Sequence, residues 1–147
     1  RVIGGTAVRP TGRPSVGLIK DIMVTLDSSC IDDDLFERAQ NAAAGWSTAE
    51  ILRARARALL ATDCPARAAT AETLLLKALD VAKAQGALAW ELRSATSLAQ
   101  LWQRQGQPRR AHALLAAVYQ RFTEGFATPD LMTASRLLDE LQCHLHA

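Results

Sequence analysis

The amino-acid sequence predicts an all-α protein made of antiparallel helix pairs, and three observations lead to that prediction. Alanine and leucine dominate the composition, whereas aromatic residues make up only 5% of the chain. Both dominant residues lose little conformational entropy on entering a helix. Apolar residues recur at helical spacing between short breaks that contain glycine or proline. No segment reads as a strand, and such short breaks make consecutive helices antiparallel neighbours.

Length, charge and cysteine content narrow the class of protein. At 147 residues the chain suits one domain, and a hydrophobic content of 49% excludes a disordered polymer. The formal net charge of +2 is too balanced to indicate nucleic-acid binding by itself. No apolar run approaches the ~20 residues that span a bilayer, and no signal-peptide pattern opens the chain. The three cysteines, without CxxC spacing, favour free thiols in a reducing cytoplasm. The missing initiator methionine suggests a processed protein or a piece of a longer one.

The chain divides into three parts. Residues 1–14 contain glycine and proline with little periodicity, which predicts an irregular leader or linker. Residues 15–45 are expected to form a divergent N-terminal helical pair, in which Asp32-Asp33-Asp34 favours the start of the second helix. Residues 46–147 carry the strongest helical periodicity, and we expect repeats and a terminal helix there.

Five helices are expected in the third part. Ser47-x-x-Glu50 matches a capping box, which places the first helix start at residue 48. That helix ends at the break Asp63-Cys64-Pro65. Gly86, Gly106 and Gly125 are expected to end the next three helices. The expected ranges are 48–62, 68–85, 88–105, 108–124 and 129–143.

Two of the expected helix pairs are similar to each other. Aligning TAETLLLKAL with RAHALLAAVY superposes Ala71 on Ala111 at an offset of 40 residues. The preceding helices superpose Ala56 on Ala99 at an offset of 43, and the difference falls in a turn, where an insertion costs little. Helices that approach to ~8–10 Å need a small side chain where they cross. We therefore expect the four alanines at helix crossings of a solenoid. A generic bundle of amphipathic helices is the alternative.

The tetratricopeptide repeat has a similar pattern of residues. The segment LAQLWQRQGQPRRAHALL resembles it through Leu98, Ala99, Trp102, Gly106, Ala111 and Leu115. The resemblance implies a tetratricopeptide-like right-handed α-solenoid of roughly three antiparallel helix pairs. Residues 129–143 would form a C-terminal covering helix, which solenoids need because an open repeat face is apolar.

A longer resemblance covers residues 45–142. Large bacterial regulators carry a similar C-terminal repeat region, and the most similar stretches are AWELRSATSLAQLW and TEGFATPDL. Those regulators combine a class III adenylate/guanylate cyclase domain, or a winged-helix DNA-binding domain, with an AAA/STAND-type ATPase. The resemblance implies a non-catalytic interaction or regulatory module, a scaffold in cytoplasmic signal transduction. The alternative is that the chain is part of a cyclase or ATPase enzyme.

The resemblance to the tetratricopeptide repeat also implies a partner-binding groove, because the first helix of each such repeat lines a concave surface. The general groove positions fall on Arg53, Arg57, Arg93, Gln100, Gln103 and Arg104. Four guanidiniums on one surface would attract carboxylates and hold them bidentately. The expected partner is therefore a protein or peptide, acidic in character, or an upstream domain of the same polypeptide. The ends of such solenoids also self-associate, which leaves a homodimer as an open alternative.

Two other interpretations of these arginines compete with the groove. A solvated, charged helix face is the simplest one. Nucleic-acid binding through Arg53, Arg55 and Arg57 is the other, but Arg55 is expected to point away from its two neighbours.

No catalytic residue, metal or cofactor is expected. The opening RVIGG is similar to the activation site of trypsin-like proteases, yet no GDSGG-like segment follows. Cys143-His144-x-His146 offers metal-binding side chains at a helix end, without a fourth ligand nearby. The glycines near the N-terminus precede no GxxxxGK[ST] phosphate loop.

Overall fold

The computed structural model describes residue 37, residues 45–62 and residues 64–146. Within them lie a 3₁₀ turn, η2, and five α-helices, and no strand. The elements are η2 (Gly45–Ser47), α3 (Thr48–Leu60), α4 (Pro65–Ala84), α5 (Leu88–Arg104), α6 (Pro108–Tyr119) and α7 (Pro129–His146). The predicted all-α class is confirmed for this part of the chain. The leader expected at residues 1–14 and nearly all of the helical pair expected at 15–45 lie outside the described residues.

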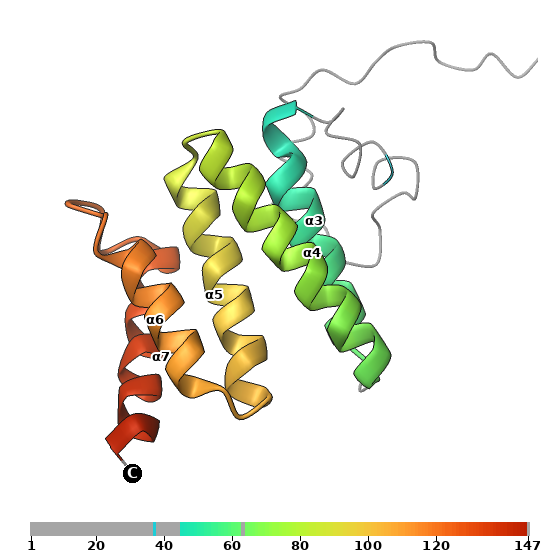
Figure 1. The fold of residues 1–147 in the computed structure, drawn as a ribbon. Coiled ribbons are helices and arrows are strands. Elements are labelled where there is room, and N and C mark those ends of the chain that lie inside the picture. The colour runs from blue at the N-terminus through green and yellow to red at the C-terminus, as the bar shows by residue number, and fades with distance from the viewer. Residues whose placement is uncertain (1–36, 38–44, 63, 147) are drawn as a thin grey trace, which may run out of the picture.

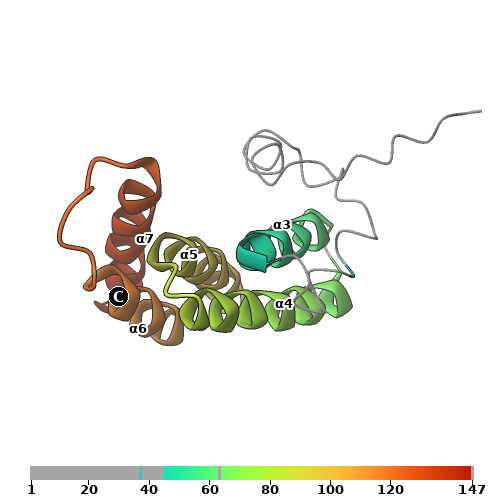
Figure 2. The ribbon, with the colours of Figure 1, turned by 90° about the horizontal axis from the view of Figure 1, so that it is seen from above.

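The five helices form two layers (Figures 1 and 2). The first layer contains α3, α5 and α7, and the second layer contains α4 and α6. Helices of the first layer run parallel to one another, and those of the second layer run in the opposite direction (Figure 1). Helix α5 packs against α3, α4, α6 and α7, so it is the centre of the arrangement. None of the described helices is long and apolar enough to cross a membrane.

Small and large apolar side chains share one core between the layers. Ala56, Ala71, Ala99 and Ala111, the four alanines expected at helix crossings, have no exposed surface. Fully buried leucines from four helices lie in the same cluster, namely Leu52, Leu75, Leu98 and Leu115. Burying one leucine contributes ~1.5–3 kcal/mol, and small side chains such as alanine allow neighbouring helices to approach closely.

Two glycines end helices where the sequence predicted. Gly86 (φ +64°) follows α4 and Gly106 (φ +72°) follows α5, both in the left-handed region that favours glycine. After α4, the N–H of Ala87 donates to the carbonyl of Ala82 at 2.9 Å, and the N–H of Gly86 donates to that of Lys83. The same pair of bonds recurs after α5. These are Schellman motifs, which satisfy carbonyls at a helix end.

Helix α3 begins at Thr48, as predicted, but without the expected cap, and α4 begins earlier than expected. Ser47 forms no side-chain capping bond, so the predicted capping box is wrong. Glu50, its expected partner, binds two arginines instead, and the Thr48 hydroxyl donates to the carbonyl of Gly45 at 2.7 Å. Helix α4 begins at Pro65 and not near residue 68, because proline is tolerated at a first helical position.

Helix α6 ends at Tyr119, five residues before the expected end. The chain then turns, which brings Arg121 onto Glu91 of α5 and Phe122 against the core. Arg121 Nη1 donates to both carboxylate oxygens of Glu91, at 2.6 and 2.7 Å. Glu91 is 2% exposed, whereas the Arg121 side chain is 54% exposed. Gly125, with φ +78°, therefore lies in the connection to α7 and does not cap α6.

Candidate functional site

All six residues of the predicted groove lie on two neighbouring helices of the first layer. Arg53 and Arg57 belong to α3, and the other four belong to α5. Arg57, Gln100 and Arg104 are exposed, whereas Arg53, Arg93 and Gln103 are half-buried. The structure thus separates the six residues into two groups by exposure. The arginines of the two groups also differ in their ion-pair partners.

Arg53 is bound by a carboxylate of its own helix. Its Nε donates to Glu50 Oε2 at 3.0 Å, and its Nη2 donates to Glu50 Oε1. The side chains of Arg53 and Glu50 are 15% and 9% exposed. A fork of this kind fixes both side chains, so the Arg53 guanidinium is held by its own helix.

Arg93 is bound by two other helices. Its Nε donates to Asp130 Oδ2 of α7 at 2.7 Å, and its Nη1 lies 3.9 Å from Glu50 Oε1 of α3. Burial disfavours the charged guanidinium, but the bond to Asp130 and the charges of Asp130 and Glu50 outweigh it, so the pKa of Arg93 is raised. Arg53, Glu50, Arg93 and Asp130 form an alternating ion-pair chain across the whole first layer.

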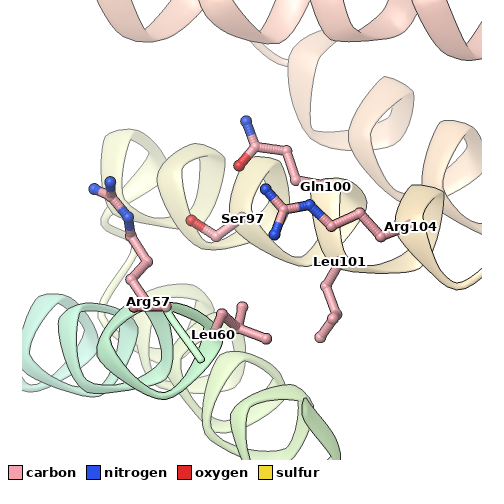
Figure 3. Close-up of a pocket in the computed structure, with 7 residues that line it drawn as sticks. Arg57, Leu60, Ser97, Gln100, Leu101 and Arg104 are labelled. Atoms are coloured by element: carbon pink, nitrogen blue, oxygen red, sulfur yellow. The ribbon is translucent and has the colours of Figure 1, made fainter. Parts of the chain in front are cut away.

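Arg57 and Arg104 have a different environment. Among the described residues, neither guanidinium has a carboxylate within 4 Å. Both line a hollow of about 280 Å³ between α3 and α5, which we call the α3–α5 hollow. Its lining consists of Arg57, Leu60, Ala61, Ser97, Gln100, Leu101 and Arg104. Figure 3 shows the two arginines reaching in from different helices, with Ser97 between them in this view.

The α3–α5 hollow is suited to binding an anionic group. Two guanidiniums supply positive charge and planar forks, and the Gln100 amide supplies a neutral donor. The Ser97 hydroxyl is already used, because it donates to the carbonyl of Arg93 at 3.0 Å. Among the described residues, the lining of the hollow contains no histidine, carboxylate or thiol. The arrangement therefore offers charge and hydrogen bonds rather than acid–base chemistry.

The sequence did not identify every residue of this region. Glu50 was interpreted as a cap, although its spacing of three from Arg53 could have suggested an ion pair. Asp130 lies 37 residues from Arg93, and no local pattern connects the two. Leu60, Ser97 and Leu101 were missed because the general groove positions of the repeat fall on other residues. Gln103 is the one predicted residue on α5 that belongs neither to the chain of ion pairs nor to the hollow.

The other candidate ligands do not converge. In the described residues, no three His, Cys, Asp or Glu side chains lie close enough together to hold a metal ion. His146 Nδ1 lies 2.9 Å from the carbonyl of Gln142, one turn back on the same helix. Cys64 and Cys143, the two cysteines in the described part, are free thiols.

Cys64 precedes the first residue of α4, and its thiol is expected to react faster than an ordinary one. The backbone N–H groups of Arg67 and Ala66 lower the pKa of the thiol, which outweighs the opposing effect of burial; the Arg67 charge adds to the lowering. In a Cys30→Ser, Cys143→Ser background, alkylation by iodoacetamide should rise with pH at a lower midpoint than for N-acetylcysteine. Arg67→Ala should keep most of that difference, because it retains the backbone donor. Identical pH profiles for protein and N-acetylcysteine would contradict the expectation.

Comparison with known proteins finds no matching family model, no matching curated protein and no matching solved structure.

Proposed function

We propose that the described helices form a tetratricopeptide-like right-handed α-solenoid, with α7 as its covering helix. Three features support this. The first helix of each expected pair lies in one layer and the second helix in the other (Figure 2). The four repeat-related alanines are all fully buried. Helix α7 packs against α5 and α6, where a cover for the last pair would lie.

We further propose that this module is a non-catalytic scaffold that binds an acidic peptide or an acidic neighbouring domain. It would act in the cytoplasm as the C-terminal part of a larger bacterial signalling regulator. The observation that carries the proposal is the pair Arg57 and Arg104 beside the α3–α5 hollow, which no carboxylate in the described part of the chain neutralises. Arg53 and Arg93, on the same two helices, are each bound by carboxylates of the chain itself. Two guanidiniums without such partners can take carboxylates from another molecule.

A partner bound there could regulate attached domains only through a difference in affinity. A ligand shifts a conformational equilibrium only as far as it prefers one state over the other. The hollow lies between helices of two different pairs, so a change in their relative position would alter the spacing of Arg57 and Arg104. Binding would then favour the arrangement in which both guanidiniums reach the same ligand.

The test is titration of the ¹⁵N-labelled chain with a capped, glutamate-rich peptide, followed by amide chemical shifts. The wild-type chain should show shifts around the α3–α5 hollow, and Arg57→Gln with Arg104→Gln should weaken binding at least tenfold. Arg109→Gln with Arg136→Gln is the matched control, because both arginines are exposed and the net charge changes equally. Equal loss of binding in both double variants would show that only overall charge matters, and would remove the proposal.

A further inference from the structure

The lining of the α3–α5 hollow has a polar rim and a partly apolar floor. Arg57, Gln100 and Arg104 are exposed and form the rim. Leu101 is 4% exposed and Leu60 is half-buried, and they approach each other from the two helices (Figure 3). A ligand group entering past the arginines would therefore meet leucine side chains below them.

The size of the hollow limits what can fill it. At about 280 Å³ it is smaller than the ~300–1,000 Å³ clefts that hold drug-sized molecules. One or two side chains of a peptide suit this volume better than a whole cofactor does. This agrees with a segment of polypeptide as the ligand.

Charge alone gives such a site little affinity. An ion pair exposed to solvent changes an equilibrium by a factor of about five at most, and salt screens it. Arg57 and Arg104 also lie in the last turns of α3 and α5, where the negative ends of the helix dipoles oppose an incoming anion. Useful affinity therefore requires a second contribution, and burial of apolar surface on the leucine floor can supply it.

We infer that the α3–α5 hollow recognises an acidic side chain followed closely by an apolar one. The carboxylate is held by Arg57 and Arg104, and the apolar side chain covers Leu60 and Leu101. This inference rests on the proposed function and specifies its ligand: a glutamate–leucine type of sequence binds, whereas a run of acidic residues alone binds weakly.

Four peptides, blocked at both ends to remove terminal charges, test the inference. They share a glycine–serine frame and carry Glu-Leu, Glu-Ser, Gln-Leu or Gln-Ser at the centre. Titrations of the ¹⁵N-labelled full chain give the dissociation constants and show whether each variant stays folded. Glu-Leu should bind tightest, and exchanging its leucine for serine should weaken binding about tenfold, which equals ~1.4 kcal/mol.

Two variants assign the leucine contribution to the floor of the hollow. Leu60→Ala should weaken binding of the Glu-Leu peptide severalfold and leave binding of the Glu-Ser peptide nearly unchanged. Leu76→Ala is the control, because Leu76 is an exposed leucine of α4 that does not line the hollow. The peptide exchange is measured on the wild-type chain, so the test holds even if Leu60→Ala fails to fold.

The outcomes separate the inference from the proposed function. If Glu-Leu and Glu-Ser bind equally, and both need Arg57 and Arg104, the apolar requirement is wrong while the acidic-peptide function stands. If Gln-Leu binds as well as Glu-Leu, the carboxylate is not recognised, and both proposals are wrong. If no peptide shifts an amide near the hollow at millimolar concentration, both are likewise overturned.

Discussion

Replacing Arg121 by alanine is expected to lower the free energy of unfolding by about 2 kcal/mol. The guanidinium binds both oxygens of the Glu91 carboxylate, which is 2% exposed. Breaking a fully buried ion pair by removing one partner typically costs ~3–5 kcal/mol, because a charge is left buried without compensation. Arg121 is itself 54% exposed, so its loss lets water reach Glu91, and the expected cost is smaller. Chemical denaturation followed by circular dichroism measures it.

Two further variants isolate the buried carboxylate as the cause. Glu91→Gln added to Arg121→Ala should restore part of the lost stability, since a neutral amide is less costly to bury unpaired than a carboxylate. Arg136→Ala removes an exposed arginine of α7 and should change stability by less than ~0.5 kcal/mol. If Arg121→Ala is no more destabilising than Arg136→Ala, the ion pair contributes nothing measurable.

Replacing Ala99 by tryptophan is expected to destabilise the chain by about 3 kcal/mol and to lower its melting temperature by roughly 10 °C or more. Ala99 is fully buried in the core and was predicted to lie where α5 crosses a neighbouring helix. An indole there can be accommodated only if the helices move apart, which exposes the leucines that they bury together. Thermal unfolding monitored at 222 nm gives the difference.

The matched control is Ala89→Trp, which changes an exposed alanine of the same helix. It makes the same change in helix propensity without forcing an indole into the core. A melting temperature for Ala99→Trp equal to that of Ala89→Trp would mean that α5 has no close crossing at residue 99. The interpretation of the four alanines as crossing points would then be wrong.

Features of the fold that depend on neighbouring residues in the sequence could be predicted. The bounds of α5 were expected within one residue, because Gly86 and Gly106 mark left-handed helix ends that other residues rarely adopt. The burial of all four alanines followed from comparing two stretches of the same chain. Such signals are local or repeated, so the sequence alone carries them.

Features that depend on distant partners were missed. Glutamate three residues after serine suggests a cap, yet Glu50 binds Arg53 and Arg93 because ion pairs with guanidiniums were available there. Helicity was expected to continue to Gly125, yet Arg121 leaves the helix axis to reach Glu91, 30 residues away. For the same reason, the sequence could not show that Asp130 neutralises Arg93, nor that no carboxylate of the described residues neutralises Arg57 and Arg104.

The parallel course of α3, α5 and α7 gives the first layer an electrical polarity. Each of these helices has an acidic residue in its first turn, namely Glu50, Glu91 and Asp130. Each of them also has arginine or histidine in its last turn. In contrast, the first turns of α4 and α6 contain no acidic residue. Because the three helices point the same way, the three acidic residues lie near one edge of the layer and the basic residues of the last turns lie near the other. Arginines pair with all three carboxylates at the first edge. Arg57 and Arg104, whose guanidiniums no carboxylate of the described residues offsets, belong to the second edge. An approaching acidic partner would be turned toward that second edge before the surfaces touch, and dissolved salt would weaken this guidance.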